Sequence, residues 1–167
     1  MRTLLILRHA HSDWKRGQLD DHNRPLNSRG RREALRVAKK LENAEVFPEL
    51  ILSSTAQRAR NTAKAVAQAL GPGVTLQLEA SLYLATPKEI VTVLCDIRSP
   101  VSRQVLVVGH NPGLEELVFI LTGHKEYLLT ASLARIELPI SSWANLCFGT
   151  NGSLRELWFP KRFSELS

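Results

Sequence analysis

The chain has 167 residues, of which 44% are hydrophobic and 23% charged, and this composition is typical of a folded globular protein rather than a disordered one. No apolar run approaches the ~20 residues that a membrane-spanning helix needs. The apolar run at the start, residues 3–7, is shorter than the ~7–15 residues expected in a signal peptide, and no small-residue cleavage site follows it. We therefore expect a single domain, residues 1–167, in a cytoplasmic protein that does not bind a membrane.

The net charge of +6 and the two cysteines exclude further classes of protein. Many of the basic residues lie between positions 29 and 40, but aromatic residues are few and no nucleic-acid-binding module is present, so we expect a solvated helix face rather than a nucleic-acid site. A basic surface would also attract an anionic substrate. Cys95 and Cys147 lie in apolar surroundings and are expected to be buried, reduced thiols. Neither begins a Cys-x5-Arg phosphate loop, which excludes a cysteine-nucleophile phosphatase.

Short apolar runs alternate with helix-like patterns over the first ~120 residues. The predicted elements, in chain order, are a strand at 4–7, a helix at 28 to about 42, a strand at 50–52, a helix at about 56–70, a strand at 74–78, a helix at 87 to about 97, a strand at 104–108, a helix from 112 to about 121, and strands at 134–138 and 154–159. This alternation predicts an α/β fold, a three-layer α/β/α sandwich whose sheet is mostly parallel. The last two strands would make the sheet mixed.

Polar residues suited to helix capping precede three of these helices. Asn27 or Ser28 is placed to cap the first, and Ser54 or Thr55 to cap the second. Asn111 is placed to cap the helix that begins at residue 112. Helix N-termini present free N–H groups, so the latter two caps would also favour a bound anion.

Three unusual segments follow predicted strands, at the carboxyl ends where α/β sheets bind their ligands. Arg8-His9 follows the first strand, the segment 53–58 with Arg58 follows the second, and His110-Asn111 follows the buried strand at 104–108. If these segments converge, two histidines and two arginines surround one point. Guanidinium groups bind phosphate oxygens bidentately and stay charged at any working pH, so this set suits a phosphoryl group.

Four motifs in this order resemble the histidine phosphatase superfamily, the relatives of phosphoglycerate mutase. They are RHA near the N-terminus, then NRPLNSRG, SSTAQRARNTA and VVGHNPG, spanning residues 5–113. The chain is most similar to the branch of small phosphohistidine phosphatases of the SixA type, and its tail, with Trp143, Gly152 and Leu154, is compatible with that branch. The superfamily's Arg-His-Gly stands here as Arg-His-Ala.

The resemblance implies a phosphoglycerate mutase-like fold, His9 as the nucleophile, and Arg8, Arg58 and a protonated His110 as the phosphate pocket. Asn111 is expected to contact the substrate. His9 would attack as a neutral imidazole and form a phosphohistidine intermediate that water then hydrolyses, without a metal or other cofactor. The expected partner is a phosphotransfer protein that bears phosphohistidine, and no apolar patch predicts an oligomer, so we expect a monomer.

The leaving group depends on whether an acid is available. Relatives that cleave esters carry a glutamate after the third strand, and here Glu79 lies one position from the expected place, which is nearer Ala80. Acid phosphatase relatives carry an aspartate where this chain has Asn111. An alkoxide leaves poorly without a proton, whereas imidazole, with a conjugate-acid pKa of ~6.5, leaves easily. A P–N substrate is therefore favoured, although Glu79, Asp13, Asp20 or Asp21 stays open as an acid.

Other interpretations stay open. His9, His11 and Asp13 have an H-x-H-x-D spacing that also occurs in zinc hydrolases, but Arg8 would place a fixed charge beside the metal and Trp14 stands where that motif has its next histidine. A phosphatase of P–O esters with the same pocket and a phosphate-binding module without turnover are the remaining alternatives. In the phosphatase interpretation His11 and Asp13 lie at the pocket rim and Trp14 forms an aromatic wall near its mouth.

Overall fold

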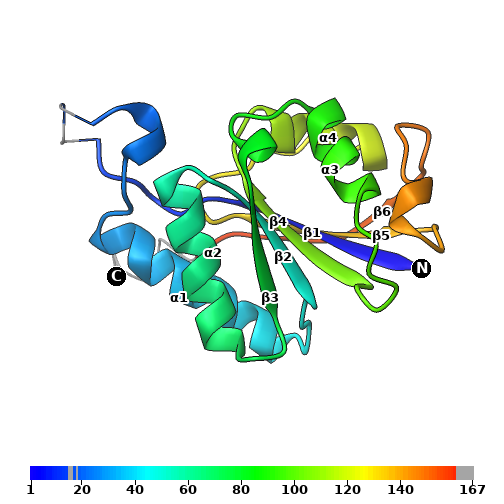
Figure 1. Ribbon diagram of the computed structural model, residues 1–167, viewed down its shortest axis with the longest axis horizontal. Coiled ribbons are helices and arrows are strands. Elements are labelled where there is room, and N and C mark those ends of the chain that lie inside the picture. Colours follow the sequence, from blue (N-terminus) through cyan, green and yellow to red (C-terminus); the bar gives the residue numbers. More distant parts are fainter. Residues whose placement is uncertain (15–16, 18, 161–167) are drawn as a thin grey trace.

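The computed structural model describes residues 1–14, 17 and 19–160, and a six-stranded sheet lies at its centre, between two layers of helices (Figure 1). The strands are β1 (Arg2–Arg8), β2 (Leu50–Ser54), β3 (Thr75–Glu79), β4 (Gln104–Gly109), β5 (Leu133–Leu138) and β6 (Ser153–Trp158). The helices are α1 (Ser28–Asn43), α2 (Gln57–Leu70), α3 (Pro87–Cys95) and α4 (Gly113–Thr122), with short 3₁₀ helices η1 (Asp21–Asn23), η2 (Ala80–Leu82) and η3 (Trp143–Asn145). Every predicted strand and helix is present, with ends shifted by a few residues.

The strand order is β3-β2-β4-β1-β5-β6. Strands β3, β2, β4 and β1 are parallel, whereas β5 pairs antiparallel with β1 and β6 antiparallel with β5. The prediction of a mostly parallel, mixed sheet is confirmed. Because β1, β2 and β4 are neighbours and run the same way, the residues that follow them meet at one edge of the sheet.

Alternate residues of the central strands face two separate cores. Leu4 and Ile6 of β1 pack toward α3 and α4, whereas Leu5 and Leu7 pack toward α1 and α2. In Figure 1 α3 and α4 lie above the sheet and α1 and α2 lie below it. The three-layer α/β/α arrangement is confirmed, and no helix in the described part of the chain is long and apolar enough to cross a membrane.

The capping predictions are confirmed for α1 and wrong for two other helices. The Asn27 side chain accepts a hydrogen bond from the N–H of Gly30 and caps α1. Helix α2 begins after Ala56 and α4 after Pro112, neither with a side-chain cap. Ser54 and Asn111 bind other groups instead, as described below, because both lie where several segments converge.

The prediction of two buried thiols is also wrong. Cys147 is exposed and Cys95 is half-buried, and both are free. Cys147 precedes a turn in which its N–H donates to Thr150 Oγ1, so the chain lies at the surface there although apolar residues flank it in the sequence.

Candidate active site

The chain that follows β1 is tied by its backbone to three other elements. The His9 N–H donates to the carbonyl of Gly109 at the end of β4 (3.1 Å). The next two N–H groups donate to side chains, that of Ala10 to Thr62 Oγ1 of α2 (3.0 Å) and that of His11 to Glu33 Oε1 of α1 (2.9 Å). The position of His9 is thus fixed by the sheet and by both helices of the lower layer.

The imidazole of His9 is buried, with 6% of its surface exposed, and is held in one tautomer. Its Nδ1 lies 2.8 Å from the carbonyl oxygen of Ala10, which can only accept, so Nδ1 carries the proton. The other nitrogen, Nε2, accepts a hydrogen bond from Arg58 Nε at 3.3 Å. Burial, with smaller contributions from the positive charges nearby, lowers the pKa of His9 to about 3. His9 is therefore neutral near pH 7, with a lone pair on Nε2, which is the form a nucleophile requires.

His110 lies beside His9, with ring centroids 5.2 Å apart. Its Nδ1 accepts a hydrogen bond from an Arg58 N–H (3.4 Å), and its Nε2–H therefore donates to Ser54 Oγ (2.8 Å). Burial, followed by the charge of Arg58, lowers the pKa of His110 to about 3. His110 is therefore neutral near pH 7 in the free protein, because burial and the neighbouring arginines disfavour its charged form. The protonated form that the sequence predicts concerns the phosphoryl-bound state.

Arg58 connects the two histidines to the segment between β1 and α1. The guanidinium is 3% exposed, and its N–H groups face His9 Nε2, His110 Nδ1 and the backbone and carboxylate of Asp21. The contacts to Asp21 are an N–H to the backbone oxygen at 2.6 Å and an ion pair at 2.9 Å. A phosphoryl group between the two rings would take the N–H groups that now face the histidines.

Asp21 holds a second arginine as well. Its carboxylate accepts from Arg24 at 3.0 Å and from the hydroxyl of Tyr83, in addition to Arg58. Partial burial would raise the pKa of Asp21, but the hydrogen bonds from Tyr83, Arg24 and Arg58 outweigh it and lower that pKa well below its usual range. Asp21 is therefore ionised in the free protein and orients the two guanidinium groups, rather than holding a proton to donate.

These side chains surround a pocket of about 250 Å³ at the carboxyl end of the parallel strands. It is lined by Arg8, His9, His11, Ser12, Trp14, Arg24, Arg58, Leu84, His110, Asn111 and Thr130. The structure brings together all five residues that the sequence singled out, namely Arg8, His9, Arg58, His110 and Asn111. Their roles in catalysis and substrate binding stay predictions.

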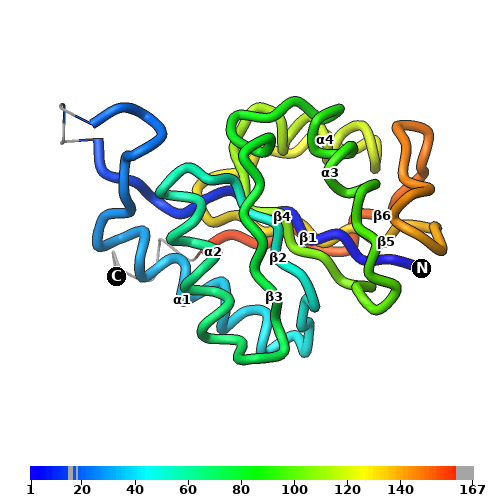
Figure 2. Tube along the Cα trace, in the orientation of Figure 1, coloured from blue at the N-terminus to red at the C-terminus, as the bar shows by residue number. Residues whose placement is uncertain are grey.

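Arg24 is a lining residue that the sequence reasoning did not assign. It is 8% exposed, donates to Ser12 Oγ and to Asp21, and lies over the ring of Trp14 with 3.5 Å between its guanidinium carbon and the ring centroid. The chain from residue 19 to residue 27 leads through η1 into α1 (Figure 2), and Arg24, directly after η1, lines the pocket. The spacing of Asp21 and Arg24, three residues apart, is the signal in the sequence that could have indicated a paired arginine.

The other predicted pocket residues are placed as follows. Arg8 Nη1 and Asn111 Nδ2 both donate to the carbonyl of Leu128, at 3.0 and 2.8 Å. Asn111 also donates to Glu115, and its Oδ1 is buried with no hydrogen-bond partner among the residues that the structure describes. The amide of Asn111 thus joins the start of α4 to the segment before β5 while the residue lines the pocket.

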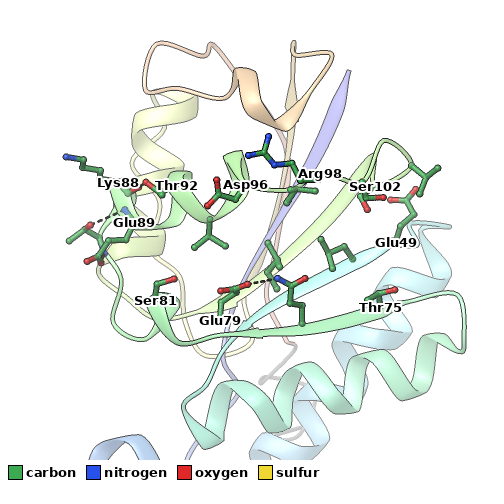
Figure 3. A pocket seen from close by; sticks show the side chains of 18 of the residues that line it. Glu49, Thr75, Glu79, Ser81, Lys88, Glu89, Thr92, Asp96, Arg98 and Ser102 are labelled. Carbon is green, nitrogen blue, oxygen red and sulfur yellow. Dashed lines mark hydrogen bonds between the residues drawn. The ribbon is translucent and has the colours of Figure 1, made fainter.

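No carboxylate lines the pocket in the described part of the chain. Glu79 lies at the end of β3 in a different, larger cavity of about 1010 Å³ between β2, β3 and α3, where it accepts from Gln77 (Figure 3). Asp20 caps η1 by accepting from the N–H of Asn23, and Asp13 is not a lining residue. Of the four acids left open by the sequence, Asp21 accepts hydrogen bonds from the pocket arginines Arg24 and Arg58.

His11 and Asp13 do not form a metal site with His9. His11 Nδ1 accepts from Asn27 Nδ2 at 2.6 Å, and His9 Nδ1 faces the Ala10 carbonyl. Among the residues that the structure describes, no three histidine, cysteine, aspartate or glutamate side chains are placed to hold a metal ion. The imidazole of His11 lines the pocket as the phosphatase interpretation predicts.

Relatives with similar sequences assign the chain to a family. The family model described as the histidine phosphatase superfamily (branch 1) matches residues 4–83. An uncharacterized chloroplastic protein of Arabidopsis thaliana is 33% identical over 154 residues, with 85% of this chain and 69% of the relative covered. The chain belongs to the histidine phosphatase superfamily. An uncharacterized protein of Mycobacterium leprae is also 33% identical to this histidine phosphatase, over 84% of this chain and 86% of its own length.

Solved structures share the fold of this histidine phosphatase. A Nakamurella multipartitia protein described as a candidate SixA phosphohistidine phosphatase has a TM-score of 0.83 at 23% identity, with 95% and 96% of the two chains covered. The protein histidine phosphatase SixA complexed with tungstate has a TM-score of 0.78 at 23% identity, covering 93% and 95%. A mycobacterial glucosyl-3-phosphoglycerate phosphatase has a TM-score of 0.70 at 18% identity, covering 95% and 98%. The phosphoglycerate mutase-like fold is confirmed, and the chain is a hydrolase of this phosphatase family.

Proposed function

We propose that this protein removes phosphate from phosphohistidine on another protein, through a covalent phosphohistidine intermediate on His9. One observation carries the proposal: a neutral imidazole and three guanidinium groups line a pocket in which the described residues place no carboxylate. The positive lining suits a phosphoryl dianion, and the absence of an acid from that lining restricts the leaving group. The fold that the protein shares with SixA supports this choice of substrate.

In the first step the lone pair of His9 Nε2 forms a bond to phosphorus, and the bond between phosphorus and the substrate nitrogen breaks. The electron pair of that bond goes to the substrate nitrogen. His9 Nδ1 keeps its proton throughout and donates it in a hydrogen bond to the Ala10 carbonyl, which fixes the orientation of the ring. The N–H groups of Arg58 that face the two histidines would bind the equatorial oxygens, where charge redistributes in a largely dissociative transition state.

The leaving group is a histidine side chain. A phosphohistidine ring that carries a proton on its second nitrogen departs as a neutral imidazole, so no acid has to deliver a proton to the breaking bond. A serine or sugar oxygen would depart as an alkoxide unless an acid protonated it. Because Asp21 is ionised and Glu79 lies in another cavity, the pocket is better suited to a P–N bond than to a P–O bond.

In the second step water attacks the phosphorus of phosphorylated His9. The P–Nε2 bond breaks, its electron pair returns to Nε2, and a water proton leaves with the inorganic phosphate or to solvent. His110, which is neutral in the free protein, would face a dianion when phosphate binds, and a neighbouring negative charge favours its protonated form. A proton gained there would stabilise both the intermediate and the product.

The test is to incubate the purified protein with a phosphohistidine peptide and measure the release of phosphate, and then to trap the intermediate. We expect turnover and a label on His9 that is lost in acid and kept in base. His9→Ala should abolish both, whereas His124→Ala, at an exposed histidine outside the pocket, should change neither.

Phosphoserine peptide and sugar phosphates serve as comparison substrates. A higher kcat/KM for either of them than for phosphohistidine would replace the proposal with a P–O phosphatase that uses the same pocket. Full activity in His9→Ala would exclude the covalent mechanism.

A further inference from the structure

Two exposed apolar side chains line a pocket that is otherwise polar and charged. Trp14 is 75% exposed and Leu84 is 54% exposed, and both are lining residues of the phosphate pocket. They come from separate segments, Trp14 from the chain beyond β1 and Leu84 from the chain between η2 and α3. Large apolar side chains left open to solvent at a binding pocket indicate a surface that the ligand covers.

Leu84 is held in a conformation that a leucine rarely adopts. Its φ of +49° is in the left-handed region, which disfavours residues other than glycine, asparagine and aspartate. The next residue, Ala85, is fixed by α4, since a Cβ on Gly113 would lie 1.9 Å from the Ala85 carbonyl oxygen. The packing of α4 therefore fixes the chain beside Leu84. A strained residue at a pocket is a reason to look for a binding role.

Trp14 is held from one side by a charged group. The Arg24 guanidinium lies against the ring, and Arg24 is itself fixed by Asp21 and Ser12. This cation–π contact orients the indole while most of its surface stays open to solvent. The aromatic surface is thus presented next to the arginines that would bind the phosphoryl group.

We propose that Trp14 and Leu84 form a subsite for the imidazole ring of the substrate's phosphohistidine. The subsite rests on the proposed function and specifies how that substrate is recognised. A phosphoryl group bound by Arg58 and the two histidines leaves its substituent among the remaining lining residues. A flat ring gains from contact with an indole and an aliphatic side chain. A sugar needs hydrogen-bond partners for its hydroxyl groups, and an indole face and a leucine offer it none.

The experiment compares two P–N substrates, a phosphohistidine peptide and phosphoramidate, which has the same bond and no ring. For Trp14→Ala and Leu84→Ala we expect kcat/KM for the peptide to fall on the order of tenfold, the effect of losing about 50 Å² of buried apolar contact. The loss should come mainly from a higher KM. For phosphoramidate we expect less than a twofold change, since no ring occupies the subsite.

Two further variants separate binding from folding. Leu84→Gly removes the side chain and also relieves the strain, because glycine adopts positive φ freely, so it should lose peptide activity while its Tm stays the same or rises. Leu35→Ala, at a leucine on α1 that is 57% exposed and does not line the pocket, should leave both substrates unchanged.

The outcomes distinguish the two proposals. A wild-type protein that hydrolyses neither P–N substrate refutes the proposed function and the subsite with it. If the wild-type protein hydrolyses both substrates, the variants test the subsite alone. The subsite is refuted if Trp14→Ala and Leu84→Gly reduce kcat/KM equally for both substrates, or for neither. Only a selective loss of activity toward the phosphohistidine peptide supports the subsite.

Discussion

The burial of two neutral histidines predicts that the protein loses stability in mild acid. In the folded protein the pKa of His9 and that of His110 are each about 3, against 6.5 for an ordinary histidine. Between these values the unfolded chain binds more protons than the folded one, so the free energy of unfolding rises with pH and falls as pH decreases from 6.5 toward 3. The same desolvation that keeps His9 neutral therefore makes the fold acid-sensitive.

The magnitude follows from the proton count. At pH 5 a histidine with a pKa of 6.5 is about 97% protonated, whereas one with a pKa of 3 is about 1% protonated, so each contributes a slope of roughly 1.3 kcal/mol per pH unit. The pair contributes about 2.6 kcal/mol per pH unit near pH 5. A typical protein has a free energy of unfolding of ~5–15 kcal/mol, so one pH unit of acidification would remove a large fraction of that stability.

Urea unfolding followed by circular dichroism at several pH values between 4.5 and 6.5 measures this slope. His9→Gln and His110→Gln should each reduce it by roughly 1.3 kcal/mol per pH unit. Thr62→Val, which removes a buried hydroxyl without removing a titratable group, should lower stability by the same amount at every pH. If His9→Gln and His110→Gln kept the wild-type slope, the neutral state of the buried imidazoles would be refuted.

Three other predictions concern the parts that hold the site. Gly30→Ala should lower Tm and activity together, because the new Cβ would lie 1.9 Å from the His11 carbonyl oxygen and overpacking of this kind costs about 1–3 kcal/mol or more. Thermal unfolding measures this loss, and an unchanged Tm would contradict the close packing at Gly30. Asp21→Asn should reduce kcat/KM about tenfold or more, because it breaks the ion pair that positions Arg58, and it should change Tm little, since the Asp21 side chain is 44% exposed. Steady-state kinetics measure the effect, and wild-type kinetics would contradict the positioning role of Asp21. Inorganic phosphate at 100 times its Kd should stabilise the wild type by about 2.7 kcal/mol, and Arg58→Met should remove most of this effect in a thermal-shift assay; equal stabilisation of both would show that phosphate binds elsewhere.

The sequence predicted the parts of the fold and site that depend on local pattern. The uninterrupted apolar run of β4 predicted a buried parallel strand, and the positions of His9, Arg58 and His110 after strands predicted that they would meet. These inferences need only the rule that parallel strands end at one edge of a sheet. They succeeded because the residues concerned lie within a few positions of a strand end.

The errors arose where distant segments compete for the same side chain. Ser54 is a residue type that commonly caps helices, but here His110 donates to its hydroxyl. The Asn111 amide donates to the Leu128 carbonyl and to the Glu115 side chain instead of capping the N-terminus of α4. Arg24 lies far from any strand end, and only the folding of the chain around Asp21 brings it to the pocket. A rule that counts positions from strand ends does not reach Arg24, so its spacing from Asp21 is the signal in the sequence that could have indicated the third arginine.

The backbone contacts around His9 have a consequence for hydrogen exchange. The amide protons of His9, Ala10 and His11 are donated in succession to β4, α2 and α1. Each is released only when a different element moves away, so these loop amides should exchange as slowly as amides in the centre of the sheet, through global unfolding rather than local opening. The segment from His9 to His11 lies in neither a helix nor a strand, yet in exchange kinetics it should belong to the most protected part of the protein.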